Sequence, residues 1–225
     1  MIDTLFPYCT DSVPERLTTA LGLADKVDDD GKLRLYPGNT AVFLLDEGTK
    51  QRLAELQDGL YHALGELGML AERLDPSAFH MTLHDLANPS LGADWIKQKV
   101  RMDRQARQVL CEIRSLEPQN LRMRATYAFQ MVRTSIVLGL EPVDSETAEK
   151  MDALYERFQG VRRLGYAMTP HITLAYFVPG DYAGKTVAKL RKALGLVRDF
   201  EMVLDTRQLV LQEFLHMNCY TTVEL

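Results

Sequence analysis

Short apolar runs alternate with longer segments of helical periodicity along most of the chain. The run TAVFLLD at 40–46 precedes a segment at 47–74 in which leucines recur at the spacing of one helix face. The run FHMTLHDL at 79–86 lies between Pro76 and Pro89 and is too short for an ordinary helix. The pattern therefore predicts a strand, an amphipathic helix and a second strand in this part of the chain.

A helix and two strands are predicted next. Apolar residues recur at helical spacing over 93–115, and the apolar segments 121–132 and 134–144 favour strands. Arg122 and Arg124 alternate with apolar residues on the first of these strands, so they share one face. Such a pair is typical either of exposed charges on an edge strand or of ligands for a substrate phosphate.

The order strand, helix, strand then occurs a second time. The strand at 134–144 is followed by a helix that starts near Ser145 and carries an apolar stripe, and then by the strand PHITLAYFVPG at 170–180. The rest of the chain predicts a helix and two strands, at 184–197, 200–214 and 216–225. The repeated order indicates two similar halves.

The second strand of each repeat carries the same four-residue pattern, HMTL at 80–83 and HITL at 171–174. Side chains at positions i and i+2 of a strand share a face, about 6–7 Å apart along the chain. His80 and Thr82 therefore point the same way, as do His171 and Thr173, while the apolar residues between them face a core. If the two repeats pack about a two-fold axis, the two histidine–threonine pairs face each other across a cleft.

Such a cleft suits a phosphodiester. In-line displacement at phosphorus needs a base on the attacking oxygen and an acid on the leaving oxygen, and an imidazole, with an ordinary pKa of about 6.5, can serve in either role. The two threonine hydroxyls can donate hydrogen bonds to the non-bridging oxygens, where negative charge sits in the transition state. This chemistry requires no metal and no cofactor.

Composition narrows the choice of partner. The chain has 225 residues, of which 46% are hydrophobic, so it is long enough for one two-lobed domain or two small domains. The formal net charge of -5 argues against a protein that binds long nucleic acid, because such binding is driven by many lysines and arginines. A small phosphorylated nucleotide or an RNA terminus needs only a few local donors and remains compatible with the sequence.

Cysteine usage and hydropathy point to the cytoplasm. Cys9, Cys111 and Cys219 are widely spaced and odd in number, which indicates neither a disulfide framework nor a zinc site. The chain lacks a signal-like start and any run of about 18 apolar residues, so we expect neither secretion nor a membrane span. We expect a cytoplasmic monomer.

The first 38 residues differ in character from the rest. We interpret 1–38 as an N-terminal extension and 39–225 as the two-lobed domain. The extension predicts a short helix after Ser12 and a hairpin around Asp30 and Gly31. The acidic triplet 28–30 is better explained by a solvated turn than by a calcium loop, because the other ligand positions hold the wrong residues.

Two H-x-T motifs at this separation, each in one half of a duplicated chain, resemble the two-histidine (2H) phosphoesterase superfamily. This superfamily includes 2'-5' RNA ligase-like proteins and cyclic phosphodiesterases, and the resemblance covers 39–225. It implies an α+β fold of two pseudo-symmetric lobes, each an antiparallel sheet with helices on its outer face, and an active-site groove between them. It also implies that His80 and His171 are catalytic and that Thr82 and Thr173 bind the phosphate.

The implied activity is hydrolysis of a cyclic phosphate, as in a 2',3'-cyclic nucleotide, an RNA end or a cyclic phosphate of ADP-ribose. Two alternatives stay open: a non-catalytic protein that binds RNA or nucleotides in the same groove, and a 2'-5' RNA ligase or esterase. The chain departs from the simplest members of the superfamily in its extension and in His84 and Asp85, so their substrate does not transfer directly.

Aromatic residues and a third histidine flank the motifs. Phe79, Tyr176 and Phe177 are candidates for stacking a base at the rim of the groove; we expect at least two of them in the core and retain Tyr176 as the substrate-binding candidate. His84 lies too far from His80 along a strand to share a metal ion with it. Strict alternation puts His84 on the face of His80, either at the edge of the groove or as a structural hydrogen-bonding group near Asp85.

Overall fold

The computed structural model describes residues 13–195 and 200–225. Cys9, the start of the predicted extension and the last two residues of the helix predicted at 184–197 lie outside the described residues. Within them, eight strands form one antiparallel sheet. From one edge to the other, the strands are β10 (Cys219–Thr222), β9 (Leu209–His216), β2 (Gly38–Leu44), β3 (His80–Asp85), β6 (His171–Tyr176), β5 (Ser135–Pro142), β4 (Asn120–Met131) and β8 (Phe200–Asp205).

The sheet consists of two halves of four strands each, which meet between β3 and β6. The two central strands, β3 and β6, carry the histidines. They are antiparallel, and Met81 pairs with Ile172 across the junction. The next strand outward is β2 in one half and β5 in the other, and each of them begins a strand, helix, strand unit. The predicted α+β fold with two similar halves is confirmed, and the two expected sheets are joined into one.

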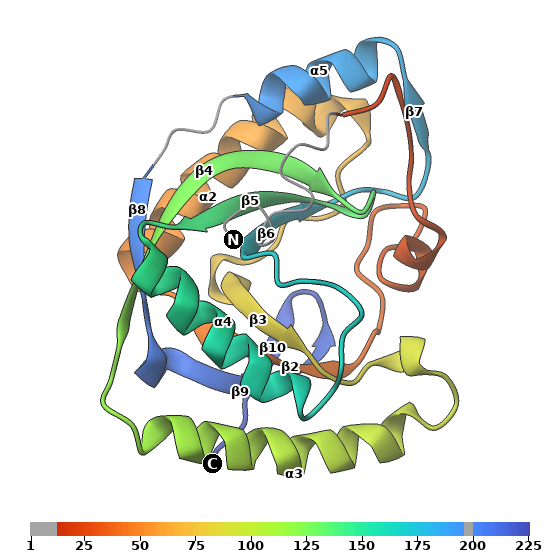
Figure 1. The fold of residues 1–225 in the computed structure, drawn as a ribbon. Coiled ribbons are helices and arrows are strands. Elements are labelled where there is room, and N and C mark those ends of the chain that lie inside the picture. The colour runs from red at the N-terminus through yellow and green to blue at the C-terminus, as the bar shows by residue number, and fades with distance from the viewer. Residues whose placement is uncertain (1–12, 196–199) are drawn as a thin grey trace.

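In the described part of the chain, four α-helices cover the outer side of this sheet (Figure 1). They are α2 (Glu47–Leu64), α3 (Trp95–Arg114), α4 (Ser145–Gln159) and α5 (Lys185–Leu194). Helix α2 connects β2 to β3 but packs against β6 and α5, while α4, which connects β5 to β6, packs against β4 and β5 of its own half and also against β3 and α3. Each connecting helix therefore contacts the histidine strand of the other half, which ties the two halves into one core.

Helices α2 and α4 begin with the same capping motif. Asp46 and Asp144 each accept a hydrogen bond from the backbone N–H three residues later, that of Thr49 at 2.9 Å and that of Thr147 at 2.7 Å. An aspartate at the N-cap satisfies an otherwise unpaired N–H and complements the positive end of the helix dipole. The internal repeat therefore extends to the residues that start each helix.

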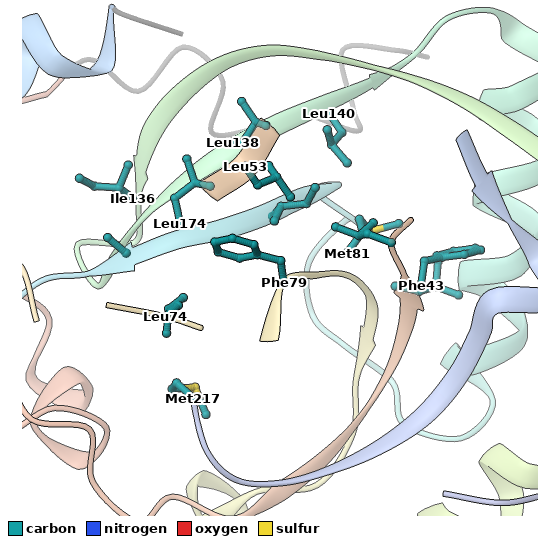
Figure 2. Close-up of a cluster of buried hydrophobic side chains, with 14 of the residues drawn as sticks. Phe43, Leu53, Leu74, Phe79, Met81, Ile136, Leu138, Leu140, Leu174 and Met217 are labelled. Atoms are coloured by element: carbon teal, nitrogen blue, oxygen red, sulfur yellow. The ribbon is translucent and has the colours of Figure 1, made fainter. Parts of the chain in front are cut away.

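A buried apolar cluster between sheet and helices holds the histidine strands (Figure 2). Met81 of β3, Leu174 of β6 and Leu53 of α2 are fully buried in it. Phe79 and Phe177 are buried as well, so core packing is confirmed for two of the three aromatic residues beside the motifs. Burial of each such side chain stabilises the fold by roughly 1.5–3 kcal/mol relative to exposure.

Two sequence predictions are wrong in detail. The helix predicted after Ser12 is replaced by strand β1 (Arg16–Thr18), which pairs with β7 (Asp181–Ala183), because the exposed edge of β7 offers it backbone partners. The single strand predicted at 200–214 is two strands, β8 and β9. The 3₁₀ turn η5 (Thr206–Gln208) separates them after Asp205 caps it by accepting from the Arg207 N–H.

Short 3₁₀ turns join the larger elements. They are η1 (Leu21–Asp25), η2 (Gly65–Leu67), η3 (Pro76–Ala78) and η4 (Pro89–Leu91). The helix predicted over 47–74 ends at Leu64, before η2, and Gly68 continues the chain with a φ of 61°. Every helix within 13–195 and 200–225 is too short or too polar to cross a lipid bilayer.

The hairpin between β4 and β5 contains two strained residues, Val132 and Arg133, with φ of 43° and 59°. The left-handed region costs an ordinary L-residue about 1–2 kcal/mol, and glycine and asparagine adopt it most easily. We therefore expect the double variant Val132→Asn/Arg133→Gly to be more stable by about 1–2 kcal/mol, which urea unfolding would measure. The control Val132→Ala/Arg133→Ala keeps both β-carbons, and an equal gain in that variant would contradict the explanation.

Candidate active site

The junction of β3 and β6 sets the geometry of the two motifs. Met81 and Ile172 are paired across it, and both side chains are fully buried. The residues on either side of this pair must then point away from the core, toward the open face of the sheet. In an antiparallel pair this leaves His80 opposite Thr173, and Thr82 opposite His171.

The four side chains therefore stand at the corners of a rectangle. Residues directly opposite each other have Cβ atoms about 4.5–5.5 Å apart, and the diagonal positions are about 7–8 Å apart. The two histidines occupy one diagonal and the two threonines the other. A phosphorus atom at the centre would have one imidazole on each of two opposite sides and one hydroxyl on each of the other two.

Both histidines are held in the same way by a backbone carbonyl two residues earlier. The Nδ1 of His80 lies 2.8 Å from the carbonyl oxygen of Ala78, and the Nδ1 of His171 lies 2.7 Å from that of Thr169. A carbonyl oxygen only accepts, so Nδ1 carries the proton in each neutral ring and donates it. The other nitrogen, Nε2, is then left with its lone pair on both histidines, as a general base requires.

Burial lowers the pKa of both histidines. The pKa of His80 falls to about 4, because burial disfavours the charged ring; the hydrogen bond to Ala78 and the negative charge of Asp85 oppose this, while positive charge on His171 adds to it. Burial also lowers the pKa of His171, opposed by its bond to Thr169 and by Asp85. The charge of Asp85 therefore favours the protonated form of both rings.

A β-bulge follows each motif at the same position. Leu83 has no partner in the register between β2 and β3, and Leu174 has none in the register between β5 and β6. One extra residue changes which side chains reach the open face beyond it. As a result Asp85 and Tyr176, which occupy equivalent positions in the two strands, both line the cavity that contains the four motif residues.

This cavity has a volume of about 230 Å³. Its walls include His80, Thr82, His171, Thr173 and Tyr176, so all the site residues predicted from the sequence lie together. The sequence did not indicate several further lining residues, which come from distant segments: Lys26, Tyr36, Asp85, Phe214 and Tyr220. Among them, only the position of Asp85 just beyond the first motif was a usable signal.

Aromatic rings form one side of the cavity. The ring of Tyr220 contacts that of His80 edge-on, with centroids 4.7 Å apart, and Phe214 lies beside Tyr220 at 5.5 Å. Tyr176 donates its hydroxyl proton toward the sulfur of Met217, 3.1 Å away, and burial raises the pKa of this hydroxyl. These rings present flat apolar surface next to the imidazole of His80.

His84 does not lie on the face of His80, so the face that strict alternation predicts for it is wrong, and of its two possible roles the place at the edge of the groove does not apply. The bulge turns its ring into the protein, where it is 1% exposed and lies near the rings of Tyr155 and Phe158 of α4. Its Nδ1 lies 2.8 Å from the carbonyl oxygen of Asp85, which confirms the expected structural role. Its Nε2 has no hydrogen-bond partner in the described part of the chain.

Arg122 and Arg124 are absent from the walls of this cavity. Both lie on β4 and contact Glu201 on the neighbouring strand β8, at 2.9 Å and 3.7 Å respectively. They are therefore cross-strand ion pairs on an exposed face, and the alternative of a phosphate contact is dropped. Among residues 13–195 and 200–225 there is also no cluster of three His, Cys, Asp or Glu side chains that could hold a metal ion.

The buried His84 makes the stability of the fold depend on pH. Burial lowers its pKa to about 4, against an ordinary value of 6.5. As pH falls, the unfolded chain therefore binds the proton first, and stability is lost between pH 6.5 and 4. Part of this loss, on the order of 1–2 kcal/mol between pH 7 and 5, belongs to His84.

We expect His84→Asn, which keeps a donor for the Asp85 carbonyl, to reduce the loss of unfolding free energy between pH 7 and 5. Urea unfolding at the two pH values measures it. His62 is exposed on α2, and His62→Asn should behave like the parent. A His84→Asn protein with the full pH dependence of the parent would show that other groups carry the effect.

Comparison with protein-family models and with curated protein sequences gives no match. Solved structures are similar over most of their length. An Agrobacterium tumefaciens protein, ATU0111, a conserved protein of unknown function, is 18% identical with a TM-score of 0.63; the match covers 92% of this chain and 93% of that one. TT0787 of Thermus thermophilus is 17% identical with a TM-score of 0.52, over 83% and 94% of the two chains.

Escherichia coli LigT, in its apo form, is 13% identical with a TM-score of 0.50, over 85% of this chain and 96% of LigT. At these identities the likeness concerns the fold. The chain therefore has a LigT-like α+β fold, in agreement with the fold that the resemblance implied.

Proposed function

We propose that the protein is a phosphodiesterase that hydrolyses a cyclic phosphate ester by acid–base catalysis with His80 and His171. The substrate class is a 2',3'-cyclic nucleotide, the cyclic phosphate of an RNA end or a cyclic phosphate of ADP-ribose. The observation that carries the proposal is the matched pair of imidazoles, each with Nδ1 bonded to a backbone carbonyl and both lining one cavity with Thr82 and Thr173.

The reaction needs one proton on the pair of histidines. Because a charge on one ring disfavours a charge on the other, the pair carries a single proton, which we assign to His171, leaving His80 as the base. His80 then takes a proton from water, whose oxygen forms a bond to phosphorus. The bond from phosphorus to one ribose oxygen breaks, and His171 donates its proton to that oxygen.

Thr82 and Thr173 would donate hydrogen bonds to the non-bridging oxygens of the phosphate. Their place on the other diagonal of the rectangle supports this role, because these oxygens point away from the line of attack. Both hydroxyls are neutral donors, so serine should replace threonine with little loss. The product is a phosphate monoester, and no step requires a metal.

The cavity supports a small substrate. A volume of about 230 Å³ and the rings of Tyr176 and Tyr220 suit a ribose phosphate whose base stacks at the rim. We infer that the partner is a small phosphorylated nucleotide or an RNA terminus and that the protein acts as a cytoplasmic monomer. Cys111 and Cys219 are free thiols, which suits a reducing compartment.

Turnover of a substrate panel tests the proposal. We expect the parent protein, with EDTA present, to open at least one member of a panel of nucleoside 2',3'-cyclic phosphates, ADP-ribose cyclic phosphate and 2'-5'-linked dinucleotides. His80→Ala and His171→Ala should each lower kcat by about 10²–10⁴-fold, because each removes a positioned acid or base. Thr82→Ala and Thr173→Ala should cost less, and the serine variants little.

His62→Ala serves as the matched control, because His62 is exposed on α2, away from the cavity. Binding of panel members without turnover would support the alternative of a nucleotide-binding protein. Turnover of the 2'-5' linkages alone would support the RNA ligase or esterase alternative. Turnover that survives both histidine variants would contradict the proposed chemistry.

The pH dependence of kcat/KM tests the role of Asp85. Its negative charge raises the pKa of both histidines, so Asp85→Asn should lower both values and move the optimum of the bell-shaped profile to lower pH. Measurement of kcat/KM from pH 4 to 8 for parent and variant shows the shift. A profile that keeps its position while its height falls would mean that Asp85 acts in another way.

A further inference from the structure

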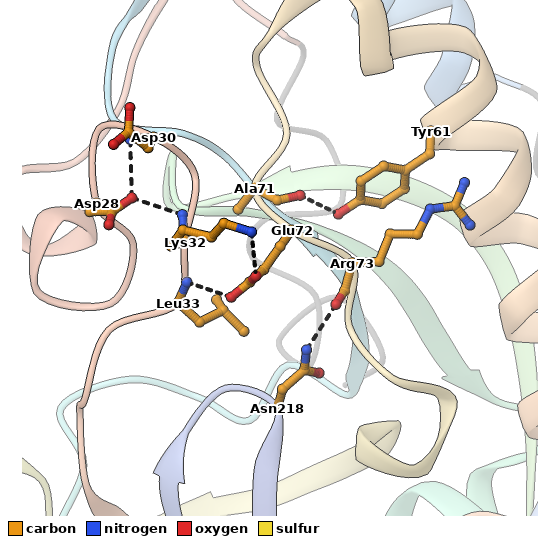
Figure 3. A network of polar contacts seen from close by, with 9 residues as sticks. All are labelled: Asp28, Asp30, Lys32, Leu33, Tyr61, Ala71, Glu72, Arg73 and Asn218. Carbon is orange, nitrogen blue, oxygen red and sulfur yellow. Dashed lines mark hydrogen bonds and ion pairs between the residues drawn. The ribbon is translucent and has the colours of Figure 1, made fainter.

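The N-terminal segment, residues 13–38, is built into the core of the protein. Leu17, Leu23 and Val27 are fully buried. Figure 3 shows how the hairpin of this segment is held: the carboxylate of Glu72 accepts from the side chain of Lys32 at 3.2 Å and from the Leu33 N–H at 2.8 Å. The segment therefore has a fixed position, which tight contacts with the connection between α2 and β3 maintain.

Other contacts tie the segment to both halves of the sheet. Strand β1 pairs with β7, and the Ala20 N–H donates to the carbonyl of Arg133 in the strained hairpin, at 3.1 Å. The hydroxyl of Tyr36 donates to Asn88, just after β3, at 3.0 Å. Any side chain that this segment directs into the cavity is therefore held relative to both motifs.

Lys26 is such a side chain. It lines the cavity, and its ammonium nitrogen lies 5.1 Å from the ring centroid of Tyr36 and 5.9 Å from that of Tyr176. Aromatic faces attract a cation, so the two rings fix the ammonium group at the cavity wall. Among the described residues, no carboxylate lies within 4 Å of it and its side chain makes no hydrogen bond.

Lys26 is the cation that this cavity offers to a phosphate while both histidines are neutral. The two threonines of the cavity are neutral, and the Nε2 atoms of its histidines present lone pairs. Apart from the histidines, Lys26 and Asp85 are the charged residues among the described residues that line it. Without Lys26 the negative charge of Asp85 would be the fixed charge beside an anionic ligand, and it would repel that ligand.

The ammonium group of Lys26 also lacks hydrogen-bond acceptors and a close negative charge, both of which a phosphate would supply. Burial lowers the pKa of Lys26, and the charges of Asp85 and Asp25 oppose this only in part. An anion bound in the cavity would favour the charged ammonium form and provide the hydrogen-bond acceptors that the protein does not. A phosphate bound in this cavity would therefore complement the partly buried cation in its wall.

We propose that Lys26 binds the phosphate of the substrate, so that the N-terminal segment completes the active site. This inference rests on the proposed function and adds to it the group that neutralises the anion. Because Lys26 acts on binding, its loss should affect KM and product affinity more than kcat. A merely structural lysine, one that only balances Asp85, would instead leave ligand affinity unchanged and lower the stability of the fold.

Binding and turnover of parent and variant proteins test the proposal. The probes are adenosine 2'-monophosphate and inorganic phosphate, titrated by calorimetry. Loss of a charge-assisted hydrogen bond should raise the Kd in Lys26→Gln by roughly 10- to 100-fold. Lys26→Arg keeps the charge and should lie between parent and Lys26→Gln. Arg34→Gln removes an equal charge from an exposed position of the same segment and should bind like the parent.

Thermal unfolding and circular dichroism establish that each variant is folded, and Lys26→Met replaces Lys26→Gln if the latter is not. An unchanged Kd in the folded variant, or an equal rise in Arg34→Gln, would overturn the proposal, as would a parent that binds neither probe. A parent that binds the probes through Lys26 but opens no cyclic phosphate would contradict the proposed function alone. Normal turnover with an unchanged KM in Lys26→Gln would contradict the role of Lys26 alone.

Discussion

The pairing of Met81 with Ile172 is the constraint on which the site depends. It is the junction of the two halves, and both side chains must stay in the core. A slip of one residue in either strand would bury that strand's histidine and threonine and expose its apolar residues. The need for an apolar core on one face therefore fixes which side chains reach the other face, and the contacts of α2 with β6 and of α4 with β3 link the two halves behind the junction.

The duplication gives the two histidines equivalent positions, and the differences between the two halves allow one histidine to act as the acid and the other as the base. The two tetrads, the two carbonyl partners and the two bulges correspond position by position. Beyond the bulges the two halves differ, because the position that holds Asp85 in β3 holds Tyr176 in β6. The two imidazoles thus begin with the same tautomer but lie in different surroundings, as an acid and a base must.

Strict alternation explains how far the sequence could predict the site. It placed His80, Thr82, His171 and Thr173 on one face and the intervening residues in the core, because these positions precede the bulges. It failed at His84, since one unpaired leucine changes the face of every later residue and leaves no mark in the composition of a six-residue strand. The prediction that Tyr176 binds the substrate rests on its nearness to the second motif, and the bulge in β6 brings its side chain into the cavity. Lys26 could not be predicted in this way, because its place depends on tertiary contacts of a segment far from either motif.

The distribution of charge follows from the same division. The repeated residues at the centre of the cavity are all uncharged when the histidines are neutral, so these residues offer an anion hydrogen bonds but no positive charge. Both fixed charges come from outside the repeated pattern: Asp85 lies two residues after the bulge at Leu83, and Lys26 belongs to the N-terminal segment. They have opposite effects: the carboxylate favours protons on the histidines, and the ammonium group offsets the repulsion that this carboxylate would exert on a phosphate. A cavity that must both keep a proton on a histidine and bind an anion therefore needs the carboxylate of Asp85 and the ammonium group of Lys26 together.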